Sequence, residues 1–374
     1  MSRISPTARL SVRKLVWILL PVLILLFSAA VIINVRRHRA PVRAVRRTLD
    51  QIRRFDPEAV SMLISADDPM GTDPEQAEAL QKLFAHFDYK ILSCSGQGKT
   101  AEIKVRFKNI DTRALARDMR SEMLRSSLSD GHGSPGSEKT APASAERTDS
   151  PLQNLSLVNG LLSRNEYELV SYEGSVFAVE TDRHWSVSPD SSLRSLLTGF
   201  LREYLQDPYL LSAGEVLAIW LDQFSSMTEE EWASYLDAED FFSTYARSSS
   251  EIDRLYLNLI SEFYHYEIGQ IDENGSEAVA QVTVTSIDMA AVLDSFRNRL
   301  IEYAGTVQSL TDDSAAMTEA AALCLTDAFR MDARSADYPV RIRLTNDGSS
   351  WQVTDITGFT DALLGNISEA SEAF

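Results

Sequence analysis

Five histidines are the first residues in this chain that could bind a metal ion or transfer a proton. They lie far apart in the sequence, at His38, His86, His132, His184 and His265. A metal site needs several ligands that converge on one point, and the chain shows no ligand spacing typical of one. The sequence therefore predicts structural or surface histidines, with no metal and no cofactor.

Two glycine-containing stretches resemble motifs for phosphate binding and for nucleophilic catalysis. Gly96 to Thr100 ends in Gly-Lys-Thr, but it lacks the earlier glycine and the strand-to-helix setting of a phosphate-binding loop. Gly131 to Gly136 holds Ser134 between glycines, without the strand and helix that a nucleophile elbow needs. We interpret the first stretch as a hairpin turn and the second as part of a loop.

The chain has two cysteines, Cys94 in an apparent strand and Cys324 in an apparent helix. They could pair, but a disulfide-stapled scaffold would need more cysteines. Cysteine usage therefore leaves open both the compartment and whether these thiols are free.

An N-terminal hydrophobic segment must position the rest of the chain at a membrane. Leu15 to Val35 supplies 21 positions without a charge. About 20 apolar residues are needed to cross a bilayer core. A cleaved signal peptide is the alternative, but the apolar run continues past the passable cleavage site at Ser28 to Ala30. We expect an uncleaved transmembrane helix over residues 15–35, after a basic tail over residues 1–14.

Basic residues flank this segment on both sides. Arg36, Arg37 and Arg39 follow it, and we expect them to contact membrane lipid together with Leu15 to Val35. Counted literally, the larger number of arginines after the span would place the body in the cytoplasm. The short N-terminal tail is also basic, so charge alone leaves the orientation open.

The body of the protein is strongly acidic. Residues 1–54 carry a net +11 and the whole chain −18, so residues 55–374 carry −29. Such a charge keeps a protein soluble and repels nucleic acid. Nucleic acid is therefore not an expected partner, and the length of the body suggests two domains.

The body contains an internal repeat. At an offset of 177 positions, Tyr89 to Ala114 aligns without gaps to Tyr266 to Ala291, with 8 of 26 residues identical. Alternating apolar and polar residues on both sides of Asp272 to Gly275 predict a β-hairpin. The first copy has the same pattern.

Each hairpin is followed by an aspartate, Asp111 or Asp288, and then by an apolar-periodic run. We expect each aspartate to cap a helix N-terminus, because its carboxylate can accept hydrogen bonds from the unpaired N–H groups of the first turn. Further along, at an offset of 166, a second hairpin ends in a strand that contains Trp185 or Trp351. The predicted core includes Trp185, Trp351, Val105, Val282, Ile110 and Ile287.

Helices are expected before each repeated hairpin. They are predicted over Val42–Arg54, Pro57–Ile64 and Pro74–Phe87 in the first copy and over Ala213–Met227, Glu229–Leu236 and Ile252–Phe263 in the second. The copies differ in the middle, where residues 126–151 are rich in Ser, Gly and Pro and predict a disordered loop. Asp312 to Met331 instead favours a helix. We assign the first α+β repeat to residues 36–205 and the second to residues 206–374.

This order of elements resembles the nuclear-transport-factor-2-like, or cystatin-like, superfamily. The anchor, the duplication and the acidic body also look like extracytoplasmic proteins of Gram-positive bacteria. The resemblance covers about residues 41 to 374 and implies an α+β fold in which helices pack on a curved, cone-like antiparallel sheet. It also implies a ligand cavity inside the cone and a body outside the membrane.

Some members of this superfamily resemble ketosteroid isomerase, which uses cavity carboxylates and a tyrosine for proton transfer. On that resemblance the cavity candidates are Tyr89, Tyr266, His265 and Asp88, although no family motif maps onto them. Aromatic residues at the start of a strand are also favoured for packing alone.

The sequence favours a membrane-anchored, non-enzymatic binding or protein-interaction module at the cell envelope. Its partner would be an envelope protein or a small molecule. The alternative is a small-molecule enzyme of the isomerase or hydratase kind, which would need a carboxylate with a raised pKa inside the cone.

Overall fold

The computed structural model describes residues 39–56, 74–130, 155–188, 190–236 and 249–372. Within these ranges no helix is both long and apolar enough to cross a bilayer. The predicted span Leu15–Val35 and the predicted helix Pro57–Ile64 lie outside them, as does most of the predicted disordered loop.

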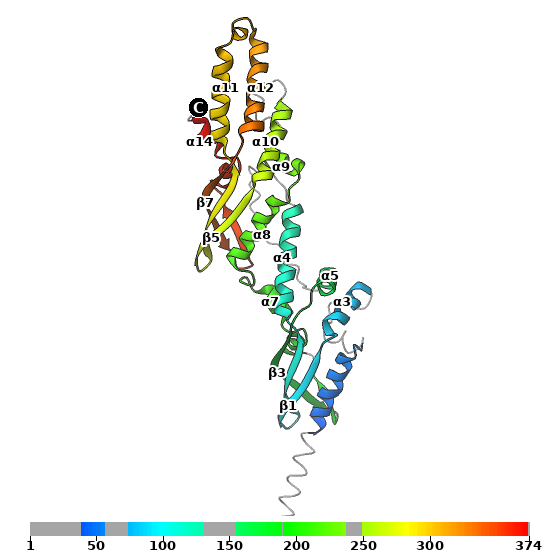
Figure 1. The fold of residues 1–374 in the computed structure, drawn as a ribbon. Helices are drawn as coiled ribbons and strands as arrows, with labels where there is room; N and C mark the ends of the chain where they lie inside the picture. The colour runs from blue at the N-terminus through cyan, green and yellow to red at the C-terminus, as the bar shows by residue number, and fades with distance from the viewer. Residues whose placement is uncertain (1–38, 57–73, 131–154, 189, 237–248, 373–374) are drawn as a thin grey trace, which may run out of the picture. The chain divides into compact units, whose positions relative to one another are not determined.

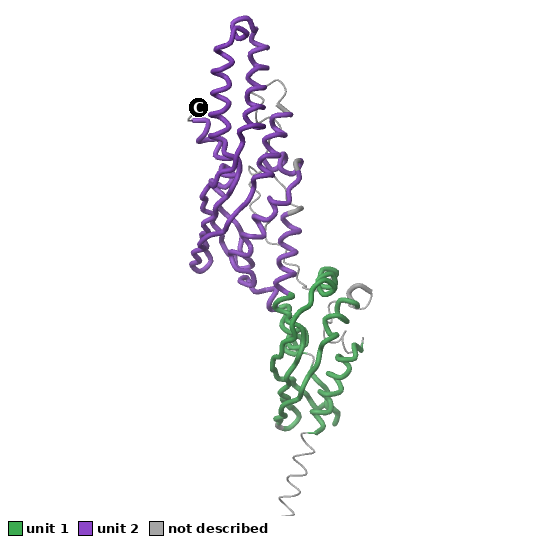
Figure 2. Tube along the Cα trace, in the orientation of Figure 1, with its two compact units in different colours: residues 1–115, 154–202 green, residues 116–153, 203–374 purple. Residues whose placement is uncertain are grey.

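The chain divides into two compact units, shown in Figure 2. Unit 1 comprises residues 1–115 and 154–202, and unit 2 comprises residues 116–153 and 203–374. Each contains one four-stranded antiparallel sheet, in the strand order β1-β2-β3-β4 or β5-β6-β7-β8. The predicted α+β class is therefore confirmed, while the curved, cone-like form stays a prediction.

Unit 1 places helices around the first sheet (Figure 1). The elements are a helix over residues 39–53, α3 (Pro74–Phe84), β1 (Asp88–Gln97), β2 (Thr100–Ile110), the start of α4 (Thr112–Asp130), α5 (Leu155–Arg164), β3 (Leu169–Thr181), β4 (His184–Val187) and α6 (Ser191–Leu197). The short helix α7 (Leu201–Gln206) spans the division between the units.

Unit 2 repeats this order, with longer helices directly before its first and third strands. Its elements are the rest of α4, α8 (Ala213–Ser225), α9 (Glu229–Leu236), α10 (Ser249–Phe263), β5 (His265–Asn274), β6 (Glu277–Ile287), α11 (Met289–Ala304), η2 (Gln308–Leu310), α12 (Ser314–Asp332), β7 (Ser335–Asn346), β8 (Trp351–Asp355), α13 (Phe359–Leu363) and α14 (Ile367–Glu372). Helices α11 and α12 form a hairpin that extends beyond the sheet (Figure 1).

The two sheets share one register. Tyr89 pairs with Phe107 in the first sheet, and Tyr266 pairs with Val284 in the second, both at the offset of 177. Each first strand carries an irregularity at the same place, after Ile91 or after Ile268. The later strands correspond at the offset of 166, so the sequence repeat reflects a repeat of backbone pairing.

Local sequence signals account for the ends of the repeated elements. Gly98 and Gly275 both have φ of +66° in the two-residue loops of the hairpins, a conformation that glycine adopts at little cost. The interpretation of Gly96 to Thr100 as a hairpin turn is confirmed. Asp111 and Asp288 each accept a hydrogen bond from a backbone N–H in the first turn of the following helix, at 3.1 Å from Ala114 and 3.0 Å from Ala291.

Helix α4 continues farther than the sequence predicts. The loop was expected to begin at residue 126, but residues 126–130 are still helical. Leu124 and Leu128, four positions apart on one helix face, pack partly buried against the core of unit 2. This packing stabilises a stretch whose composition alone favours a loop.

The predicted core is confirmed except at one tryptophan. Trp351 is 3% exposed, whereas Trp185 is only half-buried. Trp351 lies with Leu124 and Leu211 around a small cavity of about 30 Å³, and Tyr209 packs against it edge to face with ring centroids 6.0 Å apart. Trp185 was predicted as a core residue from its match to Trp351. That prediction is wrong, because a matching strand position does not by itself supply packing partners such as those of Trp351.

One pair of packed residues shows how the copies diverged. In unit 1 a Cβ added to Gly174 on β3 would lie 2.2 Å from Leu196 Cδ2, so Leu196 of α6 occupies the space above this glycine. The equivalent positions in unit 2 hold Val340 and Ala362. The larger side chain has therefore moved from the helix to the strand, which conserves volume in the core.

We predict that Gly174→Val destabilises unit 1 by about 1–3 kcal/mol, because the new methyl groups collide with Leu196. Leu196→Ala alone should cost about 2–5 kcal/mol through the cavity it leaves. Together the two changes copy the unit 2 pair and should cost clearly less than the sum. Native-state hydrogen exchange of the β2 and β3 amides measures each loss. Strict additivity would show that the two positions do not share this space.

Candidate functional site

The predicted site tyrosines make the same contact in both units. Tyr89 donates a hydrogen bond to Asp50 Oδ1 at 2.8 Å and contacts the carbonyl oxygen of Arg46 at 3.2 Å. Tyr266 donates to Asp222 and contacts the carbonyl oxygen of Ala218 at 3.4 Å. In each case the phenol connects the first strand of the sheet to a helix. It contacts an aspartate of that helix and the backbone carbonyl oxygen four residues before the aspartate.

This arrangement keeps the phenols protonated. Burial, followed by the hydrogen bond to Asp50, raises the pKa of Tyr89 to about 12. Burial and Asp222 likewise raise the pKa of Tyr266. Both side chains are therefore neutral donors at physiological pH, and their hydroxyls are already engaged.

The other two predicted candidates lie beside these tyrosines at equivalent positions. Asp88 is exposed and forms a 3.4 Å ion pair with Arg53. His265 is exposed and lies next to the ring of Tyr266, with centroids 6.4 Å apart. The structure thus brings Asp88 near Tyr89 and His265 near Tyr266. None of the four lines the groove of about 540 Å³ that the structure shows in unit 2.

The described carboxylates, histidines and cysteines do not group into a metal site. No disulfide joins Cys94 and Cys324. His184 Nδ1 lies 3.1 Å from the carbonyl oxygen of Asp182 in a turn, and His86 is exposed after α3.

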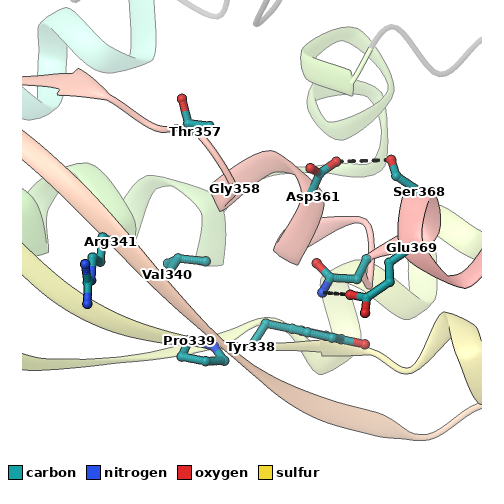
Figure 3. Close-up of a pocket in the computed structure, with 10 residues that line it drawn as sticks. Tyr338, Pro339, Val340, Arg341, Thr357, Gly358, Asp361, Ser368 and Glu369 are labelled. Atoms are coloured by element: carbon teal, nitrogen blue, oxygen red, sulfur yellow. Dashed lines mark hydrogen bonds between the residues drawn. The ribbon is translucent and has the colours of Figure 1, made fainter.

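An open groove of about 540 Å³ lies in unit 2 between β7 and the last two helices (Figure 3). Arg341 on β7 lies on one side, whereas Asp361 of α13 and Glu369 of α14 lie on the other. The full lining comprises Tyr338, Pro339, Val340, Arg341, Thr357, Gly358, Asp361, Asn366, Ser368 and Glu369. The groove therefore presents a cationic wall opposite an anionic wall.

The charged groups of the groove retain capacity to bind a ligand. Asp361 and Glu369 accept hydrogen bonds from Ser368 and Asn366, both long at 3.4 Å. No hydrogen bond or ion pair of the Arg341 guanidinium occurs within the described residues, and this side chain is exposed. A carboxylate has room for several donors and a guanidinium for several acceptors.

The floor of the groove is fixed by Tyr338. Its hydroxyl lies 3.0 Å from the carbonyl oxygen of Ile287 and 3.2 Å from that of Gly365. Burial, with the nearby charges of Asp288 and Glu369, raises the pKa of Tyr338 to about 12. This phenol is a neutral donor that holds the turn before α14 against the sheet.

Unit 1 fills the equivalent place with an aromatic ring. Phe200, at the position of Asn366, packs edge to face on Tyr172 with centroids 5.7 Å apart. Arg341 corresponds to Ser175, and Asp361 corresponds to Ser195. Glu369 corresponds to Glu203, so the opposed charges of Arg341 and Asp361 are what distinguishes the second copy. The residues of the groove were missed by sequence reasoning, although the replacement of Phe200 by Asn366 directly after the matched Gly199 and Gly365 is a signal that could have located it.

We predict that Tyr266→Phe and Tyr89→Phe each destabilise the local unit by about 1–2 kcal/mol, since each removes a hydrogen bond to a carboxylate. Tyr209→Phe is the matched control, because this residue is 53% exposed and its contact with Trp351 is an edge-to-face ring contact that the substitution keeps. Hydrogen exchange of β5 and β1 gives the local stabilities. Equal losses in all three variants would show that the aspartate contacts contribute nothing.

We further predict that the fold loses stability in alkali. The folded-state pKa of Tyr89, about 12, exceeds its ordinary value of 10.0, so the stabilising contribution is complete below about pH 10. It is lost as the pH rises from 10 toward 12. Ultraviolet titration of phenolate in the wild type and in Tyr89→Phe checks this. An unshifted titration near pH 10 for every tyrosine would contradict it.

Comparisons with known proteins assign no family to this chain. No family model and no curated protein matches it. A solved structure from Bacillus subtilis, of a protein provisionally classed as a lipoprotein (YcdA), is similar with 14% sequence identity. The match covers 75% of this chain and 96% of that one, with a TM-score of 0.27. At this TM-score the similarity is too weak to support an argument about fold or function.

Proposed function

We propose that this chain is a membrane-anchored, non-enzymatic binding module of the cell envelope whose ligand site is the groove of unit 2. The observation that supports the proposal is the position of Arg341 on one wall of the groove, opposite Asp361 and Glu369 on the other. A small zwitterion fits this pattern, with an ammonium group toward the carboxylates and a carboxylate toward the guanidinium. An amino acid or a short peptide has that chemistry.

The described carboxylates whose pKa is shifted do not have the raised pKa that proton transfer needs. A general acid or base of the isomerase kind needs a carboxylate with a raised pKa. The pKa values of Glu78, Asp332, Asp347 and Asp355 are instead lowered, chiefly by hydrogen bonds to neighbouring side chains. The phenols of Tyr89 and Tyr266 are committed to aspartates that tie a helix to the sheet.

Packing supports a binding site outside the predicted cone. Around Phe224 in unit 2, the rings of Trp220, Trp232, Tyr235 and Phe359 lie with centroids 5.0–5.8 Å from its own. These rings belong to the buried core and its border, together with residues of β6. The open groove at the sheet edge is then the better site for a polar ligand.

The proposed location rests on the sequence. Leu15 to Val35 would anchor the chain, with Arg36, Arg37 and Arg39 at the lipid surface. The body would then lie outside the membrane, where a net charge of −29 over residues 55–374 keeps it soluble.

A thermal-shift screen of free amino acids and di- and tripeptides tests the site. A ligand at ten times its dissociation constant should stabilise unit 2 by about 1.4 kcal/mol. We predict that Asp361→Asn/Glu369→Gln abolishes this shift and that Arg341→Gln weakens it.

The matched control is Glu267→Gln/Glu273→Gln, which removes the same charge from exposed positions of β5. It should leave the ligand-induced shift unchanged. The proposal fails if no compound of the panel produces a shift, or if the control loses the shift as the groove variant does.

A further inference from the structure

The helix of residues 39–53 separates an apolar face from a basic face. Val45, Leu49 and Ile52 are at most 1% exposed and belong to the core of unit 1. At about 100° per residue, the arginines of this segment fall on an arc that begins beside that stripe and reaches the opposite side of the helix. They are Arg39, Arg43, Arg46, Arg47, Arg53 and Arg54, all exposed.

One of these arginines is matched by carboxylates of the protein. Arg53 lies 3.2 Å from Asp50 and 3.4 Å from Asp88, with its guanidinium 5.8 Å from the ring centroid of Tyr89. No ion pair of the other five occurs within the part of the chain that the structure describes. We define these five, Arg39, Arg43, Arg46, Arg47 and Arg54, as the basic face.

The basic face is electrostatically unfavourable in isolation. Like charges three or four positions apart destabilise a helix by a few tenths of a kcal/mol per pair. The body carries −29 over residues 55–374, so carboxylates are plentiful, yet the basic face points away from the core that those elements build. An external anion of high charge density would relieve this repulsion.

The position of the basic face in the chain identifies that anion. Arg39 follows the predicted span by four residues, a length that reaches about 6 Å as helix and at most about 14 Å when extended. The screening length at physiological salt is about 8 Å. The first arginines therefore lie within electrostatic reach of lipid headgroups, and the planar guanidinium matches phosphate oxygens in pairs.

We infer that the basic face binds the phosphate groups of anionic lipids at the membrane surface where the chain is anchored. This rests on the proposed membrane anchor. Since the opposite face of the same helix is the core of unit 1, lipid binding holds unit 1 against the bilayer surface.

The test uses the full chain in vesicles of phosphatidylcholine, with or without phosphatidylglycerol. A nitroxide at Gln51→Cys, in a Cys94→Ser/Cys324→Ser background, reports its distance from nickel-chelating lipid headgroups through relaxation enhancement. The enhancement should be greater with phosphatidylglycerol and should disappear at about 1 M salt, where the screening length is about 3 Å.

A charge-neutral variant and a matched control sharpen the result. Arg43→Gln/Arg46→Gln/Arg47→Gln should abolish the lipid-dependent enhancement. Each arginine near an anionic surface strengthens association about fivefold, so the loss of three should weaken it about 100-fold. Lys104→Gln/Lys108→Gln/Arg113→Gln removes the same charge from exposed positions elsewhere in unit 1 and should behave like the wild type.

Flotation with the vesicles separates the anchor from the basic face. Flotation in both lipids without a difference in enhancement overturns the basic face and leaves the anchor intact. Flotation only with phosphatidylglycerol overturns the anchor and supports the basic face, and flotation with neither overturns both.

An equal loss of enhancement in the control variant attributes the effect to net charge and overturns the inference. If the neutral variant does not fold, the wild-type comparison of the two lipids still decides.

Discussion

The turn between α13 and α14 is the constraint on which the groove of unit 2 depends. A Cβ at Gly365 would lie 2.1 Å from the carbonyl oxygen of Ile287, and its φ is +69°, so this position requires glycine. Ser286 donates to the carbonyl of Leu363 at 2.6 Å, and Tyr256 donates to that of Leu364 at 2.8 Å. These buried hydroxyls fix the turn on the end of β6, and the position of Glu369 follows from it.

Unit 1 keeps the same turn with different side chains. Gly199 has φ of +62°, Thr112 donates to its carbonyl, and Tyr172 donates to the carbonyl of Leu196 at 2.6 Å. The next residue has a positive φ in both units, +64° at Phe200 and +52° at Asn366. Duplication therefore preserved the backbone constraint, whereas the following side chain closes the space in one copy and leaves it polar in the other.

The sequence alone predicts the repeated hairpins well because their signals are local. Alternation of apolar residues, glycine in the turns and an aspartate at the helix start each act over a few positions. Packing between distant segments decides why Trp351 is buried and Trp185 only half-buried. It also decides why residues 126–130 are helical. The groove could not be predicted for the same reason, since Arg341 and Glu369 are 28 positions apart in the sequence and line one groove only in the fold.

We assign the ligand site to the second copy and not to the first. Hydrogen exchange of the full chain with a bound amino acid or peptide tests this most directly, by comparing residues 357–369 with their counterparts at 191–203. We expect exchange to slow in residues 357–369 and to stay unchanged in residues 191–203. Slowing in both segments, or only in the first, would contradict it.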